Sequence, residues 1–150
     1  MSAASPTETL DWHDVRVGDQ LPAFVIDVTA TRIVAGAIAT RDFMPVHHDR
    51  AYADTQGAPD IFMNILSDTA YCSRFLTDWA GPEAMIKKLA IRLGVPVFPG
   101  STLTYTGAVT ATCLVDGEGI VEIELHGTSN LGDHVTGTAV LGLPVLGAGT

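Results

Sequence analysis

The chain has 150 residues, of which 47% are hydrophobic, and its formal net charge is −9 at pH 7. This length is ample for one packed core and too short for two ordinary domains, so residues 1–150 are expected to form a single domain. Because the chain is acidic and has no Lys or Arg after Arg92, the composition argues against nucleic acid as a partner.

The sequence has few features that indicate targeting, membrane insertion or disulfide formation. The sequence shows no signal-peptide pattern and no run of 18 apolar residues, which predicts a cytoplasmic protein that does not span a membrane. Cys72 and Cys113 lie in apolar patterns without CxxC spacing, so both are expected to be reduced core residues. Residues 1–10 and the Gly-rich residues 146–150 are expected to be loose ends.

The first regular elements are predicted before residue 41. Two segments rich in Val, Ile, Thr and Ala, Phe24–Thr29 and Arg32–Thr40, have the composition of strands. The segment that follows, residues 41–49, is therefore expected at a strand exit.

Residues 41–49 place Asp42 and His47 five residues apart, on either side of Pro45. Proline fixes its own φ and favours an extended Met44, so a bent connection can bring the Asp42 and His47 side chains towards one point. There they could hold and deprotonate a water or a substrate C–H group. The alternative is a surface turn whose Asp caps the next helix while both histidines face solvent, and the motif alone does not separate these readings.

The neighbouring His48 is expected to point away from His47, in a structural or solvent-facing role. A metal site in this cluster is not expected, because adjacent histidines without a partner two or four residues away make poor chelates.

A long helix is predicted after Pro59-Asp60, with Asp60 as its N-cap and Gly81-Pro82 as its end. Asp68 is expected to face a partner or a buried polar contact, and Asp78 to lie in the following loop. The apolar stripe at three- and four-residue steps, wide enough to be buried on more than one side, comprises Ile61, Ile65, Leu66, Thr69, Cys72, Phe75, Leu76 and Trp79.

After Pro82 the period changes to two, which predicts about four antiparallel strands. The clearest strand is 102–113, and Asp116-Gly117 marks the turn after it. His126 and His134 are expected on the solvent face of later strands. The whole pattern predicts an α+β fold in which an antiparallel sheet wraps round one long central helix.

The order of these motifs resembles the MaoC-like (R)-specific enoyl-CoA hydratases. The resemblance rests on Val-Gly-Asp-Gln-Leu-Pro at 17–22, Asp-x-x-Pro-x-His at 42–47 and Val-Phe-Pro-Gly-Ser-Thr-Leu at 97–103. It implies a single hot-dog domain and a hydro-lyase that adds water to an α,β-unsaturated acyl-CoA. It also implies no separate cofactor, because coenzyme A is part of the substrate.

A narrower resemblance is to the small hot-dog subunits of actinobacterial steroid side-chain enoyl-CoA hydratases. It implies a steroid acyl-CoA substrate in sterol catabolism and a larger MaoC-domain partner that supplies basic surface, although the same surfaces could homodimerise. The runs that carry it are 41–43, 46–50, 60–62, 64–66, 77–82 and 93–96.

The resemblance sets the roles of the candidate site residues. His47 would be the general base and proton carrier, and Asp42 would orient the water. Backbone N–H groups near Asn64 and Ile65, at the start of the helix, would receive the thioester oxyanion. Met44, Phe62 and Met63 would line or neighbour an apolar acyl pocket. The chain departs from the family's usual pattern at two of these positions, with Met44 in place of Asn and Asn64 in place of Gly.

Two other functions stay open. A hot-dog acyl-CoA thioesterase would need a helix carboxylate, for which Asp68 is the candidate. A non-catalytic scaffold subunit would need neither Asp42 nor His47, so the presence of both favours catalysis. The acyl group, the stereochemistry and the stoichiometry are not set by the sequence.

Overall fold

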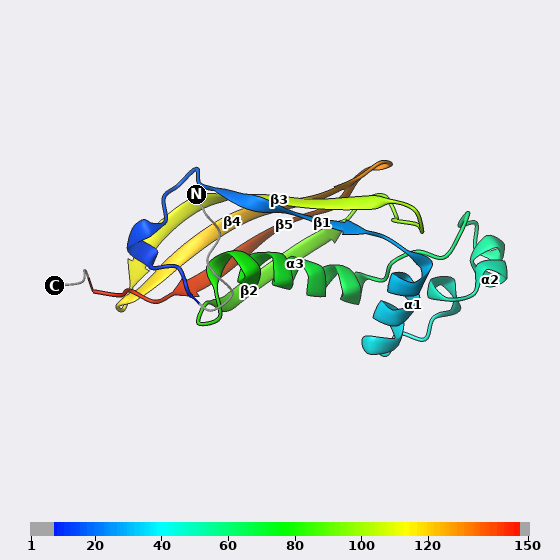
Figure 1. Cartoon of the computed structure of the whole chain (residues 1–150), viewed down its shortest axis with the longest axis horizontal. Coiled ribbons are helices and arrows are strands. Elements are labelled where there is room, and N and C mark those ends of the chain that lie inside the picture. The colour runs from blue at the N-terminus through cyan, green and yellow to red at the C-terminus, as the bar shows by residue number, and fades with distance from the viewer. Residues whose placement is uncertain (1–7, 148–150) are drawn as a thin grey trace.

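The computed structural model describes residues 8–147 (Figure 1). Its helices and strands form an α+β chain. They are the 3-10 helix η1 (Trp12–Asp14), β1 (Gln20–Asp27), α1 (Ala30–Ala39), the 3-10 helix η2 (Pro45–His47), α2 (Arg50–Thr55), α3 (Ile65–Ala80), β2 (Met85–Leu93), β3 (Thr102–Val115), β4 (Glu118–Ser129) and β5 (Gly132–Leu143).

The five strands form one antiparallel sheet in the order β1-β3-β4-β5-β2. The sheet curves over α3, while α1 and α2 lie beyond one end of it (Figure 1). This confirms the predicted sheet wrapped round one long helix. Within residues 8–147 the sheet does not close, so β1 and β2 are edge strands that can pair with another chain.

The core lies between α3 and the concave face of the sheet. Phe75, Leu76 and Trp79 of α3 are buried there with Tyr105 and other inward residues of the strands. Cys72 is buried as expected, but Cys113 is exposed. A β-bulge between Val109 and Ala111 breaks the alternation of β3, and beyond it Cys113, Leu114 and Val115 are all exposed at the end of the strand.

The segment Arg32–Thr40, predicted as a strand, is part of the helix α1. The side chain of Thr29 caps this helix by accepting a hydrogen bond of 3.1 Å from the backbone N–H of Arg32. Ile33 and Ala37, one turn apart, are buried against the rest of the protein. The cap and the alanine content therefore outweigh the β-branched residues that suggested a strand.

Helix α3 begins later than predicted, because Asn64 rather than Asp60 is its N-cap. Asp60 instead accepts hydrogen bonds from the backbone N–H of Ile61 (2.7 Å) and from Arg50 (2.8 Å). Ile65 and its neighbour Leu66, predicted within the buried stripe, are exposed in the first turn of the helix. At the other end, Asp78 is helical and pairs with Arg74 instead of lying in a loop.

Of the ends predicted to be loose, residues 1–7 and 148–150 lie outside the described part of the chain. Residues Thr9 and Leu10 are held at the end of α3. The N–H of Leu10 donates to the carbonyl of Ala80 (2.9 Å), and Thr9 Oγ1 accepts from the N–H of Glu83 (2.9 Å). Within residues 8–147, no helix is both long and apolar enough to cross a membrane.

Candidate active site

Asp42 and His47 come together at the end of α1, next to the N-terminus of α3. Arg41 adopts a positive φ of 57°, which ends α1 and turns Asp42 back so that its N–H donates to the carbonyl of Ala37. Pro45 then starts the 3-10 helix η2, which carries His47. The pair thus lies at a helix exit rather than at the strand exit predicted from the sequence, and its Nε2 to Oδ2 distance is 3.4 Å.

The orientation of His47 defines which ring nitrogen can act as a base. Nδ1 lies 2.7 Å from the carbonyl oxygen of Phe62, and a carbonyl can only accept, so Nδ1 carries a proton. In the neutral ring Nε2 is then the unprotonated nitrogen, and it faces Asp42. The Phe62 ring packs edge-on against the imidazole with centroids 5.1 Å apart, which helps to fix the ring plane.

Hydrogen-bond donors stabilise Asp42 as a carboxylate. Asn64 Nδ2 donates to Oδ2 over 2.9 Å, and the N–H of Met44 donates to Oδ1 over 3.3 Å. The Asn64 hydrogen bond lowers the pKa of Asp42 most and partial burial opposes it. The Met44 N–H lowers the pKa further, as does the charge of His47 whenever that ring is protonated. The result is a pKa below the ordinary Asp value, so Asp42 is an acceptor at neutral pH.

Asn64 links the site to α3 through both ends of its amide. Its Oδ1 accepts from the backbone N–H of Ser67 over 3.1 Å, which is the N-cap bond of the helix. Its Nδ2 donates to Thr40 Oγ1 as well as to Asp42, each over 2.9 Å. The sequence did not indicate Thr40. The Asn64 cap itself had a signal, an Asn directly before Ile65 and Leu66, although the sequence pattern placed the cap at Asp60.

The two acceptors of the site face each other across a short gap. With Nδ1 protonated, both Asp42 Oδ2 and His47 Nε2 present lone pairs, which is unfavourable unless a donor lies between them. A molecule with two O–H groups, such as water, can donate one hydrogen to each. The geometry therefore suits a bound water that can lose a proton to His47.

The N-terminus of α3 points its free donors to the same region. Of the first four N–H groups of the helix, those of Ser67 and Asp68 are bonded to Asn64, by its side chain and its carbonyl respectively. The first helical N–H groups have no intrahelical acceptor, which leaves Ile65 and Leu66 as the donors that a ligand oxygen could use. The positive end of the helix dipole adds to their attraction for a developing negative charge.

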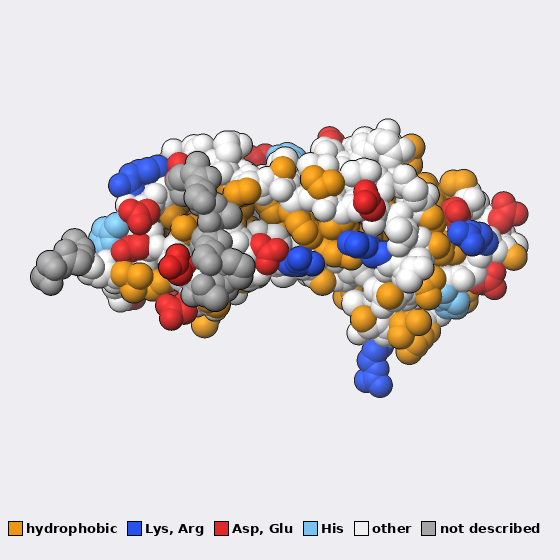
Figure 2. All heavy atoms as spheres, viewed as in Figure 1, with side chains coloured by type: hydrophobic (Ala, Val, Ile, Leu, Met, Phe, Trp, Pro, Cys, Tyr) orange, Lys and Arg blue, Asp and Glu red, His pale blue; other side chains and the backbone are white. Residues whose placement is uncertain are grey.

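Apolar side chains surround this polar group. Phe62 also packs edge-on against Phe98, whereas Met63 is buried in the core beside the site and has little free surface. Hydrophobic side chains gather on the surface over α1 and the chain that follows it (Figure 2). The exposed apolar residues near the site are Ile38, Phe43, Met44, Ile65 and Leu66.

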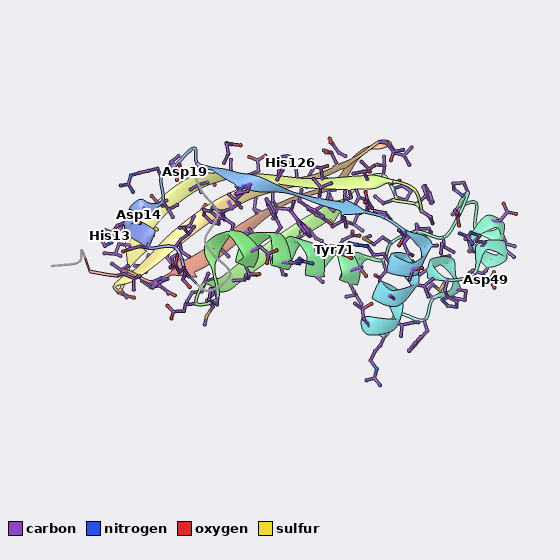
Figure 3. All side chains as sticks on the ribbon, in the orientation of Figure 1. His13, Asp14, Asp19, Asp49, Tyr71 and His126 are labelled. Atoms are coloured by element: carbon purple, nitrogen blue, oxygen red, sulfur yellow. The ribbon has the colours of Figure 1, made fainter. Side chains whose placement is uncertain are left out.

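The remaining residues of the motif have separate places. His47 is buried and His48 is exposed, as expected if Asp42 and His47 form an acid/base pair. Asp49 caps α2 by accepting a hydrogen bond from the N–H of Tyr52 (3.0 Å). It lies at the end of the molecule opposite to His13 and Asp14 (Figure 3). The alternative interpretation is therefore correct for the helix cap and for His48, and wrong for the buried His47.

Two later histidines were predicted on the solvent face, and one prediction is wrong. His126 lies on the sheet face opposite α3 and pairs with Glu124 over 2.9 Å (Figure 3). His134 is instead buried, with Nε2 2.9 Å from Asp68 Oδ1. The pairing of β4 with β5 shifts register between Gly127 and Thr128, and His134 lies at this irregularity. Simple alternation along the strand therefore does not predict which face His134 occupies.

Comparison with known proteins gives a close relative but no matching family model. The chain is 47% identical over 127 residues to the 3-oxo-4,17-pregnadiene-20-carboxyl-CoA hydratase beta subunit of Mycobacterium tuberculosis, with 85% of this chain and 95% of the relative covered. The chain belongs to this family of hydratase subunits.

Solved structures agree with this assignment. A chain of the ChsH1-ChsH2 complex from Mycobacterium tuberculosis is 48% identical and superposes with a TM-score of 0.80 over 85% of this chain and 98% of that one. An (R)-hydratase from A. caviae involved in PHA biosynthesis is 26% identical, with a TM-score of 0.78 over 87% and 98% of the two chains. The hot-dog fold and the resemblance to MaoC-like (R)-hydratases are confirmed.

Proposed function

We propose that this chain is the catalytic small subunit of an enoyl-CoA hydratase that acts on a steroid side-chain CoA thioester. The pair of facing acceptors, Asp42 Oδ2 and His47 Nε2 at 3.4 Å, carries the proposal, because it suits a water being deprotonated. The relative named for hydration of 3-oxo-4,17-pregnadiene-20-carboxyl-CoA supports the steroid substrate.

The reaction can be written with these groups. The bound water gives a proton to His47 Nε2 while its oxygen forms a bond to Cβ of the enoyl thioester. The electron pair of the double bond moves through Cα to the thioester oxygen, which receives hydrogen bonds from the N–H groups of Ile65 and Leu66. The proton on Nε2 then passes to Cα, so one water is added and His47 returns to its starting state. No step requires a metal or a redox group, and we propose that the chain uses no cofactor.

The assembly we propose is a heteromer with a larger hot-dog subunit. The 48% identical chain of known structure comes from a complex of two components, ChsH1 and ChsH2. In this chain the free edges β1 and β2 and the exposed apolar residues at the site leave surface for a partner to cover. A net charge of −9 also favours a partner that supplies cations for the coenzyme A phosphates. A homodimer is the alternative assembly.

A thioesterase activity is not favoured by the geometry. Asp68, the only carboxylate proposed for it, is fully buried and is bonded to His134. It cannot reach a thioester without unpacking the start of α3. We propose cytoplasmic localisation and no nucleic-acid partner, on the composition and charge alone.

The test uses the chain alone and co-expressed with a larger hot-dog subunit. We expect the complex to hydrate a steroid enoyl-CoA with a higher kcat/KM than crotonyl-CoA, and to release no free coenzyme A thiol. A higher kcat/KM for crotonyl-CoA would contradict the steroid substrate and leave hydration intact. Thiol release without hydration would contradict the reaction itself, and a fully active homodimer that ignores the second subunit would contradict the heteromer.

A further inference from the structure

A second Asp and His pair lies inside the protein, outside the described site. Asp68 and His134 are 0% and 2% exposed and join the first turns of α3 to β5. Asp68 Oδ1 lies 2.9 Å from His134 Nε2, while His134 Nδ1 lies 2.6 Å from the carbonyl oxygen of Val95. With Asp68 as a carboxylate both ring nitrogens face acceptors, so both bonds then need a doubly protonated ring.

The protonated form of His134 is consistent with its surroundings. Burial alone would lower the pKa of His134, but the hydrogen bond and charge of Asp68, together with the Val95 carbonyl, raise it above the ordinary value. An imidazolium opposite a carboxylate in a closed interior holds the two elements more tightly than a neutral contact would.

The pair is connected to the candidate site by two short routes. On the first route, the N–H of Asp68 donates to the carbonyl of Asn64 over 3.2 Å, and Asn64 in turn donates to Asp42. The contact of the Asp68 side chain with His134 therefore anchors to β5 the turn of helix that aims the Asn64 amide.

The second route runs through residues 94–97. His134 holds the Val95 carbonyl, and two residues later the Val97 carbonyl accepts from the N–H of Met63 over 3.2 Å. Met63 directly follows Phe62, whose carbonyl holds His47 Nδ1. The loop lies so close to β5 that a Cβ on Gly94 would collide with the Asp133 carbonyl, which leaves it little freedom to move.

We infer that Asp68 and His134 are positioning residues for the hydration reaction. They fix the start of α3 and the 94–97 loop relative to each other. Asn64 and the Phe62 carbonyl can then hold Asp42 and His47 at the distance that the reaction needs. This inference rests on the proposed function, because it assigns the pair a role in that reaction. Neither side chain touches the substrate, and each acts through the backbone it holds.

The test is Asp68→Asn, which keeps the size of the side chain and removes its charge. We expect kcat of the co-expressed complex to fall by about a hundredfold, as for a small misplacement of catalytic groups, with KM nearly unchanged. The ¹⁵N NMR signals of the His47 ring, recorded on the purified chain, should shift because the Phe62 carbonyl moves. Asp78→Asn, at an exposed carboxylate on the same helix, is the matched control and should change neither readout.

Two further variants separate positioning from stability. Ile123→Val in the core of β4 destabilises the fold away from the site, and it should leave kcat and the His47 signals unchanged. If Asp68→Asn does not fold, the double variant Asp68→Leu/His134→Phe fills the same space without a lone buried charge and should show the same two effects.

Full kcat with wild-type His47 signals in either Asp68 variant would overturn the inference. An equal fall in kcat for Ile123→Val would also overturn it, because the effect would then be one of stability. If the wild-type complex hydrates no enoyl-CoA, the proposed function fails, and the NMR signals alone decide whether the pair positions His47.

Discussion

The chain contains two Asp and His pairs that differ in their exposure to solvent: the open pair, Asp42 and His47, and the closed pair, Asp68 and His134. Asp42 and His47 are 3.4 Å apart, partly open to solvent, and meet through two acceptor atoms. Asp68 and His134 are 2.9 Å apart, buried, and meet through a donor and an acceptor. The same two residue types thus make a place for water in one region and a rigid contact in the other.

The difference comes from the second nitrogen of each histidine. In both rings Nδ1 donates to a backbone carbonyl, that of Phe62 or that of Val95. At His134 the nearby Asp68 carboxylate, with no other hydrogen-bond partner for its own second oxygen in the described residues, favours a protonated Nε2. At Asp42 the Asn64 amide already satisfies part of the carboxylate, which leaves Nε2 of His47 free to take a proton from water.

The largest effect is expected from removing the open pair. His47→Ala or Asp42→Asn should lower hydration of the enoyl-CoA by roughly 10²–10⁴-fold, the range for loss of a positioned acid or base. His48→Ala is the control, since His48 is exposed, and should retain nearly full activity. An inactive His48 variant beside an active His47 variant would reverse the assignment.

A smaller effect is expected at Asn64, which supports the open pair. Asn64→Ser can still cap α3 but is too short to reach Asp42, so kcat should fall about ten- to a hundredfold with little loss of stability. The pKa of Asp42 should rise towards its ordinary value, which NMR titration can follow. Asn64→Ala should show the same loss of kcat and in addition destabilise the protein by about 1 kcal/mol. Wild-type kcat in Asn64→Ser would remove the role assigned to its amide.

The closed pair predicts a pH dependence of stability. The folded state raises the pKa of His134 above 6.5, so its contribution is complete below that pH and is lost as the pH rises through the raised value. His134→Gln should therefore be destabilised by about 1–3 kcal/mol near pH 6, and the gap to the wild type should narrow towards pH 9.

The other titratable groups around the closed pair do not change their charge between pH 6 and pH 9, so they do not affect this pH dependence of stability. Burial, and then the charge of Asp68, raises the pKa of Cys72 to about 12 and raises that of Tyr105 as well, so both stay neutral up to pH 9. Denaturant unfolding of the two proteins at several pH values measures the gap. A gap that is constant or widens with pH would contradict a charged His134.

The smallest effect is expected at Met44, on the apolar rim of the open pair. Met44→Asn restores the residue that the family usually has there and removes apolar surface that a steroid could cover. We expect kcat/KM for the steroid enoyl-CoA to fall a few-fold, by about 1 kcal/mol, and that for crotonyl-CoA to change less. Equal changes for both substrates would show that Met44 does not contribute to the choice of acyl group.

Local patterns predicted one pair and not the other for a physical reason. Asp42 and His47 are five residues apart, and a proline between them limits the possible backbone paths. Asp68 and His134 are 66 residues apart and meet only because β5 has a particular register and α3 a particular rotation. The strand β3 was predicted correctly up to Val109, where the bulge changes the alternation, and α1 was missed because its β-branched residues obscured the Thr29 cap.

The central claim, that Asp42 and His47 act together on one water, is tested most directly by a double-mutant cycle. The kcat of the wild-type complex is compared with those of Asp42→Asn, His47→Ala and the double variant on the same enoyl-CoA. Residues that serve one water act as a unit, so the double variant should lose no more activity than the worse single variant. Losses that multiply, so that the double variant falls by the product of the two single effects, would show that the two side chains act independently and would contradict the account.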